Sequence, residues 1–164
     1  GFPNAGKSTF LNTVSSAKPK IADYPFTTLR PHLGTIKYSD NSFVIADIPG
    51  IIEGASDGHG LGIKFLKHIS RTGILLFFLE AFSEISVQDQ FLKLKKELGD
   101  FSEKLLEKEF YIVVTKIDLI DEETRFETLN TFNAKEFTNV FGISSVTGEG
   151  VQELLDDISR KIFI

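Results

Sequence analysis

The first residues of the chain, Gly1–Ser8, have types and a spacing suited to binding phosphate. They read GFPNAGKS, which fits the pattern G-x-x-x-x-G-K-[ST]. A turn of this kind points backbone N–H groups at one spot, its glycines let a phosphate approach closely, and the following helix adds its positive end. Lys7 is then expected to reach the β- and γ-phosphates of a nucleoside triphosphate, and the Ser8 hydroxyl to bind Mg²⁺. The alternative is a glycine-rich turn without function.

Two further segments could bind the same ligand. Asp47 ends an apolar stretch and begins the sequence Asp47-Ile48-Pro49-Gly50. Its carboxylate could hold Mg²⁺ through water, and the Gly50 N–H could contact a γ-phosphate. A D-x-P-G sequence alone is usually a turn, but at this distance after a phosphate-binding loop it indicates a nucleotide site. Thr27 and Thr28 lie between the two motifs, and either could complete the Mg²⁺ shell or simply start a strand.

A third group of residues fits a guanine base. The sequence Thr115-Lys116-Ile117-Asp118 follows the apolar segment 110–114. A carboxylate such as that of Asp118 can accept two hydrogen bonds from guanine N1–H and N2–H, which adenine does not offer. The stem of Lys116 can lie over the base. Residues 143–150 follow the last predicted strand, and their backbone N–H groups could meet guanine O6.

Helices and strands that alternate along the chain must position these residues. The patterning predicts helices at 7–16, 63–70, 87–98, 101–108, 122–132 and 151–162, and strands at 33–39, 42–47, 74–79, 110–114 and 139–143. We expect a hairpin turn at Asp40-Asn41, a helix N-cap at Asp121 and a helix C-cap at Gly99. This order of elements is typical of an α/β fold with a mostly parallel sheet.

Composition sets further bounds. The chain has 164 residues, enough for one domain with a sizeable core, and a net charge of −5. The acidic balance argues against binding dominated by nucleic-acid phosphates, and no apolar run is long enough to span a membrane. With no cysteine, disulfides and thiolate metal sites are excluded, and a cytosolic protein is expected. With no methionine and no strand before Gly1, we expect an N-terminally truncated segment, whose missing first strand would weaken folding and nucleotide binding.

In this order, the motifs resemble those of the P-loop GTPases, and more closely those of the Obg GTPases, a branch that acts in large ribosomal subunit assembly. The similarity rests on Gly1–Leu11, on Ile21–Thr35 (IADYPFTTLRPHLGT) and above all on Ile45–Gly73 (IADIPGIIEGASDGHGLGIKFLKHISRTG). The developmentally regulated GTP-binding proteins share P-G-I-I-E-G-A but differ after it. The resemblance implies one GTPase domain over residues 1–164, with a three-layer P-loop NTPase fold, helices on both faces of the sheet and the first strand missing.

The resemblance also implies a set of site residues, with switches at 26–30 and 50–73. The expected Mg²⁺ ligands are Ser8, Thr28 and Asp47. The expected catalytic residues are Lys7, Thr28, Gly50 and Asn4. The residues expected to contact the nucleotide are Gly1, Phe2, Pro3, Asn4, Ala5, Gly6, Lys7, Ser8, Thr9, Phe26, Thr27, Thr28, Leu29, Arg30, Asp47, Ile48, Pro49, Gly50, Thr115, Lys116, Asp118, Ser144, Ser145 and Val146.

Three positions depart from the usual GTPase pattern. Thr115 replaces the Asn of N-K-x-D, and the loss of the amide that ties this loop to the phosphate loop predicts weaker binding, with guanine preference retained through Asp118. Glu80 replaces an Asp, which we expect to be benign.

Ile51 stands where many GTPases have the Gln that orients the attacking water. A residue other than Gln is usual here in the Obg branch, so hydrolysis must be slow or use another group. We hypothesise that Asn4 binds a K⁺ ion that stabilises the developing charge; otherwise it only satisfies the turn.

The expected function is that of a slow, Mg²⁺-dependent GTPase switch in large ribosomal subunit assembly. Its ligand would be a guanine nucleotide and its partner a ribosomal particle, met through the parent protein; we expect a cytoplasmic monomer without a membrane span. Two alternatives remain. A nucleotide-gated binding module with negligible hydrolysis is favoured by Ile51, and an ATP-using P-loop enzyme is opposed by Asp118.

Overall fold

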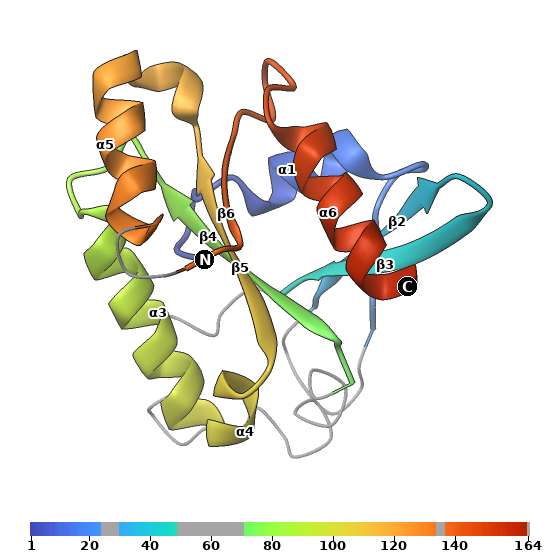
Figure 1. Ribbon diagram of the computed structural model, residues 1–164. Coiled ribbons are helices and arrows are strands. Elements are labelled where there is room, and N and C mark those ends of the chain that lie inside the picture. The colour runs from blue at the N-terminus through green and yellow to red at the C-terminus, as the bar shows by residue number, and fades with distance from the viewer. Residues whose placement is uncertain (24–29, 49–70, 134–136, 164) are drawn as a thin grey trace. The chain divides into compact units, whose positions relative to one another are not determined.

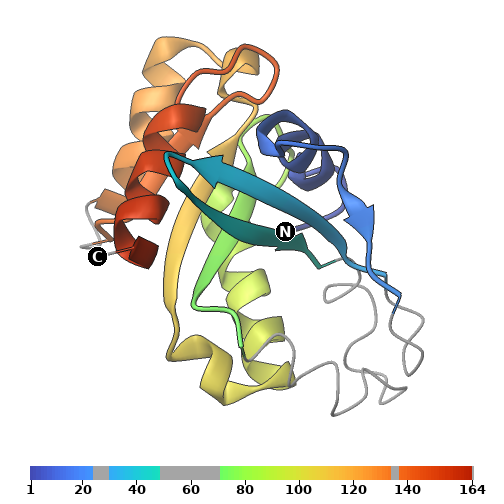
Figure 2. The same cartoon turned by 90° about the vertical axis from the view of Figure 1, so that its right-hand side faces the viewer.

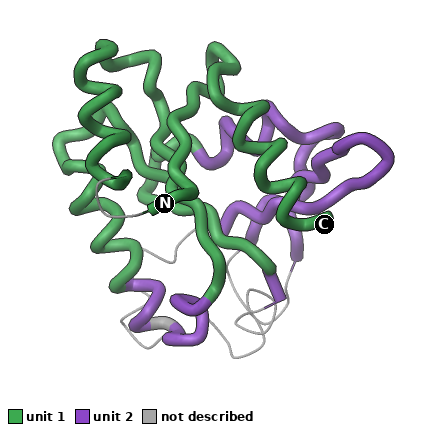
Figure 3. The backbone as a smooth tube through the Cα atoms, in the orientation of Figure 1, with its two compact units in different colours: residues 1–6, 73–96, 108–164 green, residues 7–72, 97–107 purple. Residues whose placement is uncertain are grey.

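The computed structural model describes residues 1–23, 30–48, 71–133 and 137–163 (Figure 1). The chain divides into two compact units (Figure 3). Unit 1 comprises residues 1–6, 73–96 and 108–164, and unit 2 comprises residues 7–72 and 97–107. The predicted helix at 63–70 lies outside the described residues.

Unit 1 is built on a parallel sheet with the strand order β4-β5-β6. The strands are β4 (Ile74–Glu80), β5 (Glu109–Thr115) and β6 (Val140–Ile143), as the sequence predicts within a few residues. Parallel strands covered on both faces read as continuous apolar runs. The central strand β5 follows this rule, since residues 111–114 are fully buried.

Helices cover both faces of this sheet (Figure 1). On one face, Phe77 and Phe110 of the sheet meet Phe91 of α3 (Val87–Phe101), which also packs edge-on against Phe132 of α5 (Glu122–Asn133). Side chains alternate between the faces of a strand, so Tyr111 faces the opposite side. There its hydroxyl donates a hydrogen bond of 2.7 Å to Asp157 of α6 (Val151–Phe163). Unit 1 is thus a three-layer α/β arrangement, as expected.

Unit 2 holds an antiparallel sheet with the order β1-β2-β3 and the helix α1 (Lys7–Val14) (Figure 2). The strands are β1 (Lys20–Ile21), β2 (His32–Tyr38) and β3 (Asn41–Asp47). The segment after α1 is tied to β2, because the Ser16 N–H donates to the Thr35 carbonyl at 2.9 Å. Unit 2 also contains the short helix α4 (Glu103–Leu106), within residues 97–107.

Two local predictions are wrong by small shifts. Tyr38 pairs with Asn41, so the hairpin turn consists of Ser39 and Asp40, and Ser39 has a left-handed φ of 51°. The helix that was expected to end before Gly99 continues to Phe101. Gly99 is not left-handed there; instead, a Cβ at this position would lie 3.0 Å from Leu106, so the missing side chain leaves room for α4.

None of the helices in the described part of the chain has the length and apolar character needed to cross a bilayer.

Candidate functional site

The phosphate loop, residues 1–6 in unit 1, is a tight turn with two left-handed residues. Asn4 has a φ of 65° and Gly6 a φ of 91°. The second value is one that side chains rarely tolerate, so glycine is required at that point. The Ala5 N–H donates to the Phe2 carbonyl at 3.2 Å, and Ala5 is buried. The loop therefore has the compact shape that the sequence motif predicts.

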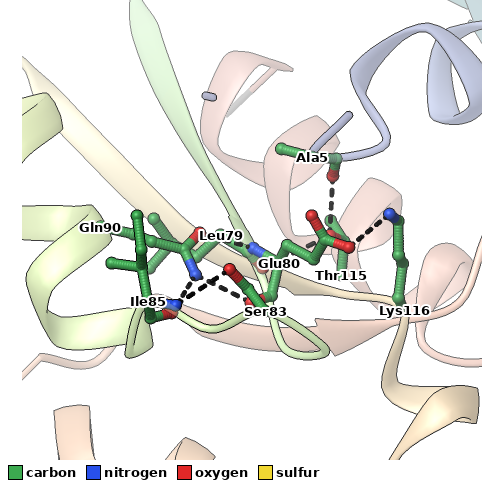
Figure 4. Close-up of polar contacts among 8 residues, drawn as sticks. All are labelled: Ala5, Leu79, Glu80, Ser83, Ile85, Gln90, Thr115 and Lys116. Carbon is green, nitrogen blue, oxygen red and sulfur yellow. Dashed lines mark hydrogen bonds and ion pairs between the residues drawn. The ribbon is translucent and has the colours of Figure 1, made fainter. Parts of the chain in front are cut away.

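Thr115 at the end of β5 is bonded directly to this loop (Figure 4). Its hydroxyl donates to the Ala5 carbonyl at 2.7 Å, and the Leu79 carbonyl lies 3.3 Å from the same oxygen. Thr115 is only 3% exposed, so this hydrogen bond is shielded from water. Loss of the Asn amide therefore does not leave this strand end without a link to the phosphate loop. The shorter side chain makes the link through its hydroxyl. The weaker nucleotide binding expected from Thr115 stays a prediction.

The next residue, Lys116, is held by Glu80 (Figure 4). Its Nζ lies 2.5 Å from Glu80 Oε1, and both side chains are mostly buried. Lys116 has a left-handed φ of 60° and precedes the 3-10 helix η2 (Ile117–Leu119). Glu80 ends β4 and pairs with Thr115 in the sheet register. The lysine expected to cover the base is thus anchored at the carboxyl end of the neighbouring strand.

Gln90 of α3 fixes the loop that leaves β4. Its Oε1 accepts from the Glu80 N–H at 2.9 Å, and its Nε2 donates to the carbonyls of Glu80 and Ile85 at 2.9 and 2.8 Å. Gln90 is 2% exposed, and Figure 4 shows its contacts with Glu80 and Ile85. No role was predicted for Gln90 from the sequence, although it lies three positions after Val87 and four before Leu94, on the apolar face of the helix, where a polar residue signals a buried hydrogen bond.

The second expected base-binding loop, residues 143–150, is closed on Ser144, which is fully buried. The Ser144 N–H donates to the Glu149 carbonyl at 2.9 Å, and the Gly148 N–H donates to the Ser144 carbonyl at 2.9 Å. The Ser144 hydroxyl accepts from the Thr147 N–H at 3.1 Å. Val146 is 82% exposed and Asp118 is also exposed, so both are open to a ligand.

In unit 2, α1 and β3 bring together Ser8 and Asp47, two of the three residues expected at the metal ion. The Ser8 hydroxyl donates to Asp47 Oδ2 at 3.2 Å. Asp47 is 8% exposed, and among the described residues its Oδ1 has no hydrogen-bond partner. Burial lowers the pKa of Lys7, against the opposing effect of the Asp47 carboxylate. A buried carboxylate oxygen without a partner, next to a hydroxyl, suits a hard cation such as Mg²⁺.

Several predicted site residues cannot be placed. Phe26, Thr27, Thr28, Leu29, Pro49 and Gly50 lie outside the described residues, and so does Ile51. Arg30 is described; its exposed side chain lies 3.9 Å from Asp23, as a surface charge would.

A parallel sheet with helices on both faces, and a phosphate loop bonded to a strand end that carries Thr-Lys-Ile-Asp, define a P-loop GTPase domain. Comparison with known proteins agrees. Residues 1–116 match the family described as 50S ribosome-binding GTPase. The chain therefore belongs to this GTPase family, and its predicted membership of the Obg branch is confirmed by similarity to proteins named GTPase Obg.

Two such relatives illustrate the similarity. The chain is 53% identical over 163 residues to GTPase Obg of Chloroherpeton thalassium, covering 99% of this chain and 47% of the relative. It is 52% identical over 163 residues to GTPase Obg of Parabacteroides distasonis, covering 99% and 42%. The chain thus spans about half the length of the relatives it matches.

Solved structures support the fold. The G domain of the T. maritima FeoB iron transporter has a TM-score of 0.64 at 22% identity, with coverage of 96% of this chain and 92% of that one. The cytosolic domain of L. pneumophila FeoB has a TM-score of 0.71 at 15% identity, with coverage of 98% and 65%. At such low identity these structures show a shared fold and no more.

Proposed function

We propose that this chain binds GTP and GDP with Mg²⁺ and hydrolyses GTP slowly, acting as a molecular switch. The observation that carries the proposal is the hydrogen bond from Thr115 to Ala5, because it joins the guanine-motif strand to the phosphate loop. Asp118 and the loop at Ser144–Val146 would bind the base, and Lys7 the phosphates. Ser8, Asp47 and Thr28 would hold Mg²⁺, which neutralises phosphate charge during transfer.

Equilibrium binding tests whether the site selects guanine over adenine nucleotides. A fluorescent guanine nucleotide should bind the chain and be displaced by GTP and GDP but not by ATP, since the Asp118 carboxylate would accept two hydrogen bonds from guanine N1–H and N2–H, a pair of donors that adenine lacks. Asp118→Ala should weaken the binding of guanine nucleotides and reduce the difference in affinity between GTP and ATP. Displacement by ATP as effective as that by GTP would instead support an ATP-using P-loop enzyme.

Hydrolysis needs its own measurement, because Ile51 offers no polar group to orient water. We expect single-turnover phosphate release that is slow, requires Mg²⁺ and is abolished by Lys7→Ala. Tight GTP binding with no phosphate release above the rate of free GTP would favour a nucleotide-gated binding module.

We also propose that Asn4 binds K⁺ beside the transferred phosphate. The left-handed backbone of Asn4 and its exposed side chain support this role, since the side chain is open to a ligand at the phosphate loop. Hydrolysis should be faster in KCl than in NaCl, and Asn4→Ala should remove the difference. Equal rates in both salts for the unmodified chain contradict the proposal.

The partner proposed for the parent protein is the large ribosomal subunit, as the family description suggests. We further propose a cytoplasmic monomer, in keeping with that partner. Co-sedimentation with isolated 50S particles should be stronger with a non-hydrolysable GTP analogue than with GDP. Sedimentation that does not depend on the nucleotide would contradict a switch.

A further inference from the structure

Arg125 of α5 bonds to two separate segments of unit 1. Its Nη2 donates to the Ile117 carbonyl at 3.0 Å, and its Nη1 lies 2.5 Å from Glu149 Oε1. The arginine side chain is 26% exposed, so three quarters of it is shielded from water. Nothing in the sequence pattern singles out this residue, which lies on a helix with many charged and polar side chains.

The two segments are the ones proposed to bind the base. Ile117 lies between Lys116 and Asp118 and is buried, so its carbonyl belongs to the backbone that presents the Asp118 carboxylate. Glu149 closes the other loop, because its carbonyl accepts the Ser144 N–H at 2.9 Å. The guanidinium therefore bridges both loops.

The capped first turn of α5 fixes the backbone position of Arg125. The Arg125 N–H donates to the Asp121 carbonyl at 2.9 Å, and the Asp121 carboxylate caps the helix by accepting the Thr124 N–H at 2.7 Å. A capped first turn resists fraying, so the arginine starts from a fixed backbone position.

The chemistry of guanine makes the separation of these loops important. Asp118 must reach N1–H and N2–H while N–H groups near Val146 reach O6, and these atoms sit at fixed positions on one ring system. A planar guanidinium has several donors in a rigid fork and can hold two acceptors at once, which a lysine ammonium does less well. We infer that Arg125 is a positioning residue that sets the spacing of the two base-binding loops and so sharpens the preference for guanine. The inference rests on the proposed guanine-nucleotide function.

An ordinary surface ion pair would have little effect on binding. The contact to the Ile117 carbonyl distinguishes Arg125 from such a pair, since a partly buried hydrogen bond from a charged donor is stronger than one from a neutral donor. Arg160 of α6 offers a matched control: its Nη2 pairs with Asp157 at 3.3 Å, and its Nε bonds to Asp156 of its own helix.

The test measures dissociation constants for GDP and for IDP, which lacks the 2-amino group that Asp118 would bind. Arg125→Gln should weaken GDP binding by about tenfold, the size expected for one charged hydrogen bond, and lower the preference for GDP over IDP. Arg125→Lys should give an intermediate loss. Glu149→Gln should lower the preference for GDP over IDP by about threefold. Arg160→Gln should leave both dissociation constants within about twofold of those of the unmodified chain.

Thermal melts of each variant separate positioning from stability. A preference for GDP over IDP that is unchanged in Arg125→Gln overturns the inference, even if both affinities fall together. If Arg125→Gln does not melt cooperatively, Glu149→Gln decides, because its half-exposed side chain can be changed with little cost to folding. A chain that binds no guanine nucleotide before any substitution contradicts the proposed function instead.

Discussion

Thr115 shows how much a single atom can matter in this domain. Its hydroxyl links β5 to the phosphate loop, and Thr115 is buried. A buried carbonyl that loses its donor costs about 1–3 kcal/mol. Thr115→Val, which keeps the shape of the side chain, should lower the free energy of unfolding by that amount and weaken GDP binding. Chemical denaturation and equilibrium binding measure the two effects.

Thr115→Ser supplies the control for that substitution, since it keeps the hydroxyl and removes only a methyl group. It should bind GDP nearly as well as the unmodified chain. If Val and Ser at this position behave alike, the hydrogen bond to Ala5 is not what supports the loop.

Asp47 carries the metal prediction at the same scale. The Oδ1 atom without a described partner is the one available to Mg²⁺ or to its water. Asp47→Asn should raise the Mg²⁺ concentration needed for tight GTP binding by about tenfold, because it removes the negative charge that attracts the cation. Titration of GTP affinity against Mg²⁺ measures this. Binding in excess EDTA should be nearly unchanged.

Tyr111 gives a prediction for alkaline pH. Burial, and then the hydrogen bond to Asp157, raise the pKa of Tyr111 above its usual value of 10.0. The unfolded chain therefore loses this proton first as pH rises, so stability falls from about pH 10 upward. The free energy of unfolding of Tyr111→Phe, measured by denaturation at several pH values, should fall less steeply above about pH 10 than that of the unmodified chain. The same slope in both proteins would show that other groups cause it.

Contacts between elements explain why some small residues are required. A Cβ at Gly34 in β2 would collide with Ser15 and lie 2.6 Å from the buried Leu11 of α1. Overpacking of this kind typically costs about 1–3 kcal/mol, so Gly34→Ala should lower stability by that amount. Gly73→Ala is the matched control, since a Cβ there lies within 4 Å of no atom of the described residues. Urea denaturation compares the two, and equal losses would argue against the contact between α1 and β2.

Gln90 links two elements, because it hydrogen-bonds from α3 to both backbone groups of Glu80 at the end of β4. It makes the position of Lys116 depend on α3, a helix that carries none of the recognised motifs, because Lys116 is paired with Glu80. A helix packed for its apolar face thus also supports the proposed base site.

At the scale of the whole molecule, ligand binding and folding are linked. A ligand that binds only the folded chain stabilises it, by about 2.7 kcal/mol at a concentration of 100 times its dissociation constant. GDP with Mg²⁺ at that level should therefore raise the unfolding free energy by this amount, and ADP should not. Thermal or urea denaturation measures the shift. A shift of equal size with ADP would argue against a guanine site.

The sequence by itself determined the motifs, the α/β class and the Obg resemblance. Each depends on residues close together in the chain, whose spacing limits what their backbone can do. Helix and strand positions in the described residues mostly followed from the spacing of apolar residues, with boundary errors at Ser39 and Gly99. The two-residue strand β1 was not predicted, since it has no apolar pattern of its own. The roles expected for Thr28 and Gly50 stay predictions, since both lie outside the described residues.

The tertiary structure alone decided which distant side chains meet. Thr115 and Ala5 are 110 positions apart. Only the folded structure shows that the threonine hydroxyl makes the link for which the usual N-K-x-D pattern has an asparagine amide. The same holds for Gln90 with Glu80 and for Arg125 with the two loops of the proposed base site. Local patterns do not encode such pairs, because a hydrogen bond depends on distances and angles that are set when separate elements pack together.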